Sequence, residues 1–174
     1  SYRVPQVGKV IVRSIFDRTL FVLGRALAVA APAGMIIWVM GNVYVGDSSI
    51  LTHCTVFLEP FGRLMGLDGV ILLAFILGFP ANEIVFPIIL MGYMATGTLT
   101  EYGSLVELRE ILVANGWTWV TALCTMIFCL FHFPCGTTLI TIYKETKSFK
   151  WTVFGFLLPT IIGIASCLIL NLIF

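Results

Sequence analysis

Long apolar stretches alternate with short polar ones along the chain, and their lengths predict which of them cross a membrane. A spanning helix needs about 20 mostly apolar residues. The stretches at 20–43 and 150–174 are that long, so we predict a membrane span in each. Four basic residues precede the first span, at positions 3, 9, 13 and 18. Because basic segments stay in the cytoplasm, residues 1–18 are predicted to be a cytoplasmic approach.

Two other apolar segments are interrupted. Segment 70–94 is broken by GFPANE at 78–83, and each apolar flank is about half of the ~20 residues that a span needs. The flanks are therefore either collinear halves of one span or the arms of a re-entrant hairpin. Segment 117–146 is broken by HFPCGTT at 132–138 and is read as a broken span.

Two further segments are too polar to span. Residues 49–66 mix apolar side chains with Glu59 and Arg63, which favours a helix lying in the membrane interface. Residues 104–115 begin with the capping-box pair Ser104 and Glu107 and stop at Asn115, which predicts a short amphipathic surface helix.

Charge favours the hairpin for 70–94. The basic N-terminus and the lysines 144, 147 and 150 both prefer the cytoplasm. If 70–94 turns back, the broken span returns these lysines to the cytoplasmic side, whereas a crossing would place them outside. The predicted order is span, interfacial helix, re-entrant hairpin, surface helix, broken span and span.

Composition agrees with a lipid environment. Hydrophobic residues make up 59% of the 174 positions and charged residues only 11%, whereas soluble domains carry roughly 25% charged residues. The chain is therefore expected to be an all-α integral membrane protein. No basic block suggests nucleic acid, and the first apolar stretch runs past signal-peptide length without a cleavage site. Three cysteines in apolar runs, Cys124, Cys129 and Cys167, are expected to be small buried hydrophobes.

The two interruptions resemble each other. Both place Phe-Pro between half-helices, with Gly78 and Pro80 at the first and Pro134 and Gly136 at the second. Proline frees a backbone carbonyl, and the next half-helix begins with unpaired N–H groups and a positive dipole end. Paired interruptions of this kind point to a transporter binding site near the membrane midplane.

Glu83 is the sharpest candidate for chemistry. An ionisable group in an apolar segment is costly unless it faces a cavity or a partner, so it is a functional candidate. The alternative is structural, with Asn82 or Glu83 capping the following helix.

The second interruption offers other groups. Cys135 opens a half-helix, where a thiolate or a metal ligand is plausible, but a small residue chosen for packing fits equally well. His132 could be a ligand, although a histidine at a helix break is more often scaffolding. Thr137 and Thr138 are expected to cap the next half-helix and to line a path.

This mixed set of ligands suits iron(II), cobalt or zinc better than magnesium or calcium, which prefer oxygen ligands. Because Glu83 and Cys135 both stand at Phe-Pro interruptions, we also expect them to act on the same ion. The residues themselves leave a polar organic substrate open.

Three phrases carry a family resemblance: VGKVIVRSIFDRTLFVLGRA, LGFPANEIVFPIILMGY and FHFPCGTTLITIYKETKSFKWT. Together they resemble the C-terminal part of the membrane region of FeoB, the bacterial ferrous iron transport protein B family. That family has an N-terminal GTP-binding domain and two Gate segments related to nucleoside transporters, and this chain looks like the second. In the family, Gate cysteines are proposed to line the iron path, which maps onto Cys135.

The resemblance implies a multi-pass protein of the bacterial inner membrane that forms half of a GTP-dependent Fe²⁺ uptake path. Fe²⁺ is then a substrate and no cofactor is permanently bound. The chain has no GxxxxGK[ST] loop, so GTP and Mg²⁺ would belong to the absent G domain, and the chain itself is not expected to be an enzyme. Implied partners are membrane lipid, the first Gate half, the G domain, small accessory iron-transport proteins and further copies of the chain.

Two alternatives stay open at this point. One is a nucleoside or other organic-solute carrier of the same architecture, which should hold a polar pocket of several hundred cubic ångströms. The other is a non-transporting membrane scaffold, in which both helix breaks should be tightly packed.

Overall fold

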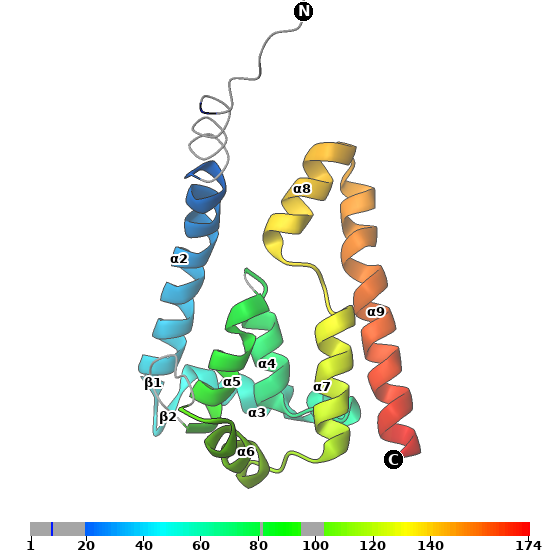
Figure 1. Ribbon diagram of the computed structural model, residues 1–174. Coiled ribbons are helices and arrows are strands. Elements are labelled where there is room, and N and C mark those ends of the chain that lie inside the picture. Colours follow the sequence, from blue (N-terminus) through cyan, green and yellow to red (C-terminus); the bar gives the residue numbers. More distant parts are fainter. Residues whose placement is uncertain (1–7, 9–19, 81, 95–102) are drawn as a thin grey trace, which may run out of the picture.

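The computed structural model describes residues 8, 20–80, 82–94 and 103–174 (Figure 1). The cytoplasmic approach predicted for 1–18 lies outside the described residues, apart from position 8. Ala81, within the first interruption, is outside them as well.

Helices dominate the described residues, together with one two-stranded ribbon. In chain order they are α2 (Leu20–Asn42), β1 (Tyr44–Val45), β2 (Ser48–Ser49), α3 (Ile50–Leu64), α4 (Gly69–Leu77), the 3-10 turn η2 (Asn82–Ile84), α5 (Val85–Met94), α6 (Leu105–Ala114), α7 (Trp119–Phe131), α8 (Gly136–Thr146) and α9 (Phe149–Ile173). The predicted all-α class is confirmed.

Two helical stretches in the described part of the chain are long and apolar enough to cross a membrane. They are Trp119–Thr146, which includes the α7–α8 break, and Phe149–Ile173. Only 11% of the most apolar 18-residue stretch of α9 is buried within the chain. An apolar helix about 37 Å long, at 1.5 Å per residue, cannot leave such a surface to water. The chain is a membrane protein.

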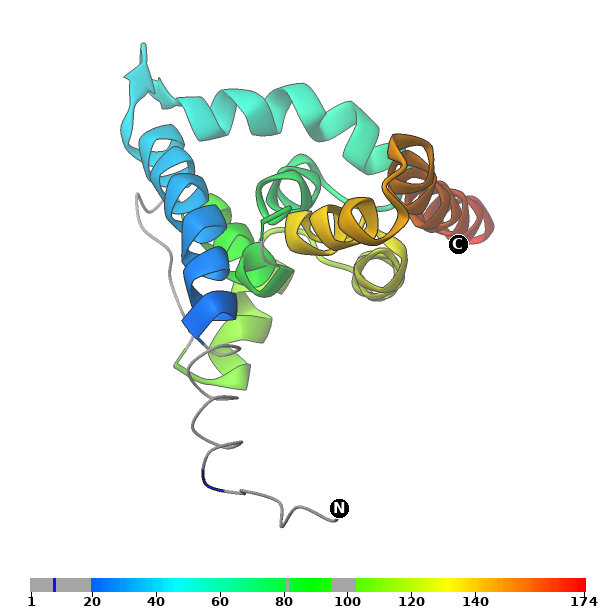
Figure 2. The ribbon, with the colours of Figure 1, turned by 90° about the horizontal axis from the view of Figure 1, so that it is seen from above.

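Helix α3 lies across the other helices and turns sharply into α4. Its N-cap is Ser49, whose hydroxyl accepts a hydrogen bond from the Thr52 N–H, and the bend between α3 and α4 is 107°. At its far end, Asn171 of α9 donates to the carbonyls of Arg63 and Leu64, both at 3.1 Å. Figure 2 shows α3 running from the end of α2 to α9.

Helices α4 and α5 fold back on each other. A Cβ added at Gly92 would lie 2.6 Å from Val70, so the last turn of α5 packs against the first turn of α4. At the open end of this pair, the Tyr93 hydroxyl donates to the carboxylate of Asp68, the N-cap of α4. The segment is therefore a helical hairpin whose two open ends meet, as one of the two sequence alternatives proposed. Its placement in a membrane stays a prediction.

The turn between α3 and α4 concentrates the polar interactions beside this hairpin. Burial raises the pKa of Asp68 above its ordinary value, against the lowering effect of hydrogen bonds from Tyr93 and the Ile71 N–H. Burial also acts to raise the pKa of Glu59, but hydrogen bonds from Arg63 and the Gly69 N–H leave it below its ordinary value.

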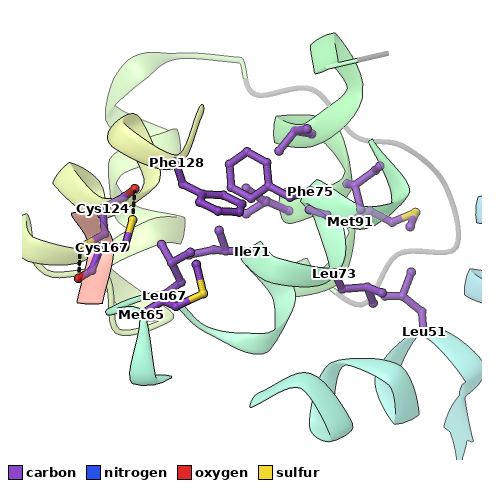
Figure 3. Packing of buried hydrophobic residues seen from close by; sticks show 14 of the residues in the cluster. Leu51, Met65, Leu67, Ile71, Leu73, Phe75, Met91, Cys124, Phe128 and Cys167 are labelled. Atoms are coloured by element: carbon purple, nitrogen blue, oxygen red, sulfur yellow. Dashed lines mark hydrogen bonds between the residues drawn. The ribbon is translucent and has the colours of Figure 1, made fainter. Parts of the chain in front are cut away.

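The core lies between the hairpin and α7 (Figure 3). Ile71 and Phe75 of α4 are at most 1% exposed, and the Phe75 ring meets Phe128 of α7 edge to face at 4.8 Å. Beyond them, Cys124 and Cys167 join α7 to α9 through reciprocal contacts, each sulfur facing the other residue's carbonyl at 4.0 and 3.4 Å.

The burial predicted for three cysteines is right for two of them. Cys124 and Cys167 are fully buried, whereas Cys129 is exposed. The expectation for Cys129 is wrong because five residues along α7 rotate the side chain by about 140°, away from the face that packs on α9. Apolar surroundings in the sequence cannot tell a face that contacts lipid from one that contacts protein.

Helix α6 has the predicted ends. The Ser104 hydroxyl accepts a hydrogen bond from the Glu107 N–H, and Glu107 in turn accepts from the Gly103 N–H. The helix stops at Asn115, and Gly116 takes a positive φ of 86°.

Candidate functional site at the two helix breaks

The two helix breaks touch each other. The Gly136 N–H, at the start of α8, donates a 3.0 Å hydrogen bond to the carbonyl of Phe79, which follows the C-cap residue Gly78 of α4. In Figure 1 the hairpin tip and the α7–α8 break lie at about the same level, roughly half-way along α9. The first N–H of the α8 half-helix is therefore already paired with backbone from the other break.

The phenylalanines of the two Phe-Pro motifs also meet. The ring centroids of Phe79 and Phe133 are 5.7 Å apart. Phe156 of α9 completes the cluster, at 5.3 Å from Phe133 and 6.4 Å from Phe79. Gly78, Pro80, Pro134 and Gly136 thus belong to one contact region rather than to two separate interruptions.

Cys135 is the N-cap residue of α8 and is half-buried. Its sulfur lies 3.1 Å from the hydroxyl of Thr137 and 3.1 Å from that of Thr138. The threonines were expected to cap α8 themselves. Instead, Cys135 occupies the cap position and both hydroxyls face its sulfur. Three polar side chains are thereby gathered at the start of one half-helix.

Asn82 and Glu83 lie in η2 at the hairpin tip, and both are exposed. Neither side chain forms a hydrogen bond within the described residues, and the 3-10 turn leads directly into α5. The alternative capping role therefore gains no support. The carboxylate is free at the tip of a hairpin that contacts the Cys135 segment.

His132 is set apart from these groups. It is 8% exposed, its Nδ1 lies 2.9 Å from the Cys129 carbonyl, and its ring is 5.2 Å from Phe75. Its Nε2 is buried and has no hydrogen-bond partner within the described part of the chain. The structure thus holds this imidazole behind the contact region.

A preformed metal centre is absent from the described residues, where no three His, Cys, Asp or Glu side chains are grouped to hold an ion. The arrangement consists of separated polar groups near two broken helices.

Sequence reasoning missed two features, one in this region and one at the open end of the hairpin. Phe156 sits in a plain apolar helix, and nothing in its neighbours distinguishes it from lipid-facing residues. The chain Trp117–Tyr93–Asp68, in which the Trp117 ring N–H donates to the Tyr93 hydroxyl at 2.6 Å, was also missed. Asp68 before an apolar run was a readable helix-start signal, whereas its bond to Tyr93 required the hairpin.

Comparison with known protein families identifies the architecture. The family model Gate, described as nucleoside recognition, matches residues 23–149. The chain belongs to the Gate family. The match includes both helix breaks and the hairpin between α3 and α6.

This Gate segment is also similar to two curated transporters along nearly its whole length. It is 27% identical to the Fe(2+) transporter FeoB of Staphylococcus aureus (strain MSSA476), over 92% of the chain. It is 24% identical to the Fe(2+) transporter FeoB of Leptospira interrogans serovar Lai (strain 56601), over 97% of the chain. The chain spans only 24% and 27% of the lengths of these relatives. No solved structure matches it.

Proposed function

We propose that this Gate segment forms half of the ion path of a ferrous iron uptake transporter. The observation that carries the proposal is the direct contact between the two helix breaks, through the Gly136 N–H and the Phe79 carbonyl. The contact brings a half-helix N-terminus, a cysteine and an acidic hairpin tip into one region. Broken helices that meet in an apolar protein are typical of transporter sites.

The ligand chemistry favours a borderline metal. The path groups we propose are Cys135, Glu83, Asn82, His132, Thr137 and Thr138. A thiolate and an imidazole prefer Fe²⁺ to Mg²⁺ or Ca²⁺, while the carboxylate and hydroxyls replace part of the hydration shell of any cation. Both relatives are named Fe(2+) transporters, which agrees with this preference.

The two largest cavities described along α6 and α7 give no support to an organic-solute carrier. Two cavities of about 440 and 460 Å³ lie along α6 and α7. Their lining includes Trp117 and Ala122 but no residue of 78–84 or 132–138. A nucleoside needs a pocket of that size with polar groups at the binding site, and these spaces lie elsewhere. A scaffold remains less favoured, because an exposed Glu83 at a hairpin tip has no structural partner in the described chain.

The setting we propose is a multi-pass protein of the bacterial inner membrane. The start of α2 and the lysine-bearing α8–α9 turn lie at one end of the molecule, and α3 and α6 lie at the other (Figure 1). This arrangement suits a cytoplasmic side at the lysines. GTP dependence would come from a G domain elsewhere in the full-length protein, and the first Gate half would complete the path.

Uptake into liposomes tests the proposal. The full-length protein that carries this segment is reconstituted under anaerobic conditions, and Fe²⁺ entry is measured with and without GTP. We expect GTP-stimulated Fe²⁺ uptake that excess Co²⁺ or Zn²⁺ reduces and that Mg²⁺ and nucleosides leave unchanged. Uptake of nucleosides, or inhibition of Fe²⁺ uptake by nucleosides but not by metals, would contradict the proposal and favour the organic-solute carrier.

A further inference from the structure

Three phenylalanine rings fill the contact between the two breaks. Phe79, Phe133 and Phe156 come from the hairpin, the broken span and α9, and their ring centroids lie 5.3–6.4 Å apart. Gly136 allows this close approach, since a Cβ there would lie 3.2 Å from the Phe79 ring. Apolar side chains at this position exclude water, and a hydrated cation cannot pass where water is excluded.

His132 lies directly behind one of these rings. Its ring centroid is 5.3 Å from that of Phe133, and Phe75 covers it at 5.2 Å. Because the Cys129 carbonyl can only accept a hydrogen bond, the neutral ring carries its proton on Nδ1. The lone pair is then on Nε2, which is buried without a partner within the described residues.

The carbonyl-bound Nδ1 and the unpaired Nε2 resemble the arrangement of a metal-ligating histidine. In metal sites, a backbone carbonyl commonly fixes one ring nitrogen so that the other presents its lone pair to the ion. A buried polar atom left unpaired is rare in proteins and calls for a reason, such as a ligand that binds in another state. Here the His132 ring lies among the rings of Phe75, Phe128 and Phe133, at centroid distances of 5.2–6.2 Å.

We propose that Phe79, Phe133 and Phe156 form a hydrophobic gate between the two helix breaks, and that its opening exposes Nε2 of His132 to the transported cation. The inference rests on the proposed function for the identity of the cation. The structure then represents the closed state. Opening requires the hairpin tip to separate from the start of α8, which breaks the bond between the Gly136 N–H and the Phe79 carbonyl.

The first test measures access to position 132 and needs no iron. His132→Cys is placed in the full-length protein after Cys129 and Cys135 are replaced by alanine, and its reaction with a small water-soluble thiol reagent is timed without GTP. We expect slow labelling that rises at least tenfold with Phe133→Ala or with Phe156→Ala. The matched control is Phe154→Ala. Phe154 lies on α9, as Phe156 does, but it is 51% exposed and outside the ring cluster, so its replacement should leave the labelling rate unchanged. Equal rates in all four proteins would overturn the gate.

The second test measures ion entry into liposomes without GTP. With native His132 and cysteines, Phe133→Ala and Phe156→Ala should each raise Fe²⁺ entry severalfold, and Phe154→Ala should not. If the variants label faster, but neither they nor the GTP-stimulated wild-type protein admit Fe²⁺, the gate is supported and the proposed iron transport is contradicted. Faster labelling without added entry beside an active wild type would show that the rings are packing and no gate. Because Phe156 lies outside both breaks, an effect of Phe156→Ala cannot be explained by local unfolding at position 133.

The third test isolates the histidine. His132→Gln is added to Phe133→Ala, and the entry of Fe²⁺ and of Mg²⁺ is compared. An imidazole ligand should help Fe²⁺ but not Mg²⁺, so the double variant should lose Fe²⁺ entry by severalfold while Mg²⁺ entry stays the same. An equal change for both ions, or no change, would assign His132 a packing role alone.

Discussion

The two helix breaks share the Phe-Pro motif, yet the chain leaves them in different directions. At the first, α4 and α5 turn back and form a hairpin whose open ends meet at Asp68 and Tyr93. At the second, α8 continues roughly along the direction of α7 (Figure 1). The same local motif therefore supports both a re-entrant hairpin and a broken span.

The difference comes from the partners of each half-helix. Val85 of α5 packs where Gly78 has no Cβ, and Val70 packs where Gly92 has none, so α4 and α5 bury each other. Helices α7 and α8 instead both pack along α9, where Gly163 allows contact with Phe131 and Gly155 faces Ile142. Glycines on α9 allow this close approach of helices. A proline motif permits a break, and the neighbouring helices decide its direction.

The difference between the two breaks is tested most directly by finding on which side of the membrane the neighbouring loops lie. Single cysteines replace Asp47, Ser104 and Lys147 in the full-length protein after the exposed native thiols are removed. If the first break turns back, positions 47 and 104 should be labelled from outside intact spheroplasts, and position 147 only after permeabilisation. Labelling of positions 47 and 104 from opposite sides of the membrane would show that the segment 70–94 crosses it.

The next prediction asks whether the two breaks serve one ion. Glu83→Gln and Cys135→Ser should each lower Fe²⁺ uptake by on the order of tenfold or more, because losing even an outer partner that orients a metal ligand typically costs about 10–100-fold. The double variant should be little worse than the worse single one, because damage to a shared site is not additive. Thermal unfolding in detergent serves as the control for folding. Wild-type uptake in both single variants, or fully additive losses, would separate the two breaks functionally.

A smaller effect should distinguish how tightly each break is packed. A Cβ at Gly78 would lie 2.4 Å from Val85 and 2.9 Å from the Ala74 carbonyl, so Gly78→Ala should lower the free energy of unfolding by about 1–3 kcal/mol. Gly136→Ala meets only the edge of the Phe79 ring at 3.2 Å and should cost less. Gly24→Ala in α2, with nothing within 4 Å, should be neutral or stabilising by up to about 1 kcal/mol. Thermal or denaturant unfolding of the purified protein would rank them, and equal losses at 78 and 136 would contradict the difference.

The smallest predicted effect concerns the closure of the hairpin. Tyr93→Phe removes the hydrogen bonds that join Asp68, Tyr93 and Trp117, and should lower stability by about 1–2 kcal/mol. Tyr143→Phe, at an exposed position on α8, is the matched control and should change little. If both variants unfold at the wild-type temperature, the bond between the open ends does not hold the hairpin closed.

The sequence by itself determined the elements of this protein. Apolar length identified the final span, which the structure begins at Phe149, and the Ser104–Glu107 pair marked the start of α6. The two Phe-Pro interruptions were equally readable. Each of these features depends on neighbours within a few residues, through caps, missing N–H donors and the length needed to cross lipid.

Only the tertiary structure decided what those elements contact. The tertiary fold buried Cys124 and exposed Cys129, and it packed the His132 ring against Phe133. It also joined Phe79 to Gly136 across more than fifty residues. Lipid and protein interior are both apolar, so hydrophobicity cannot assign a helix face to one or the other. The contact between the breaks depends on which helices leave room for a close approach, and that room is set by glycines on distant segments of the chain.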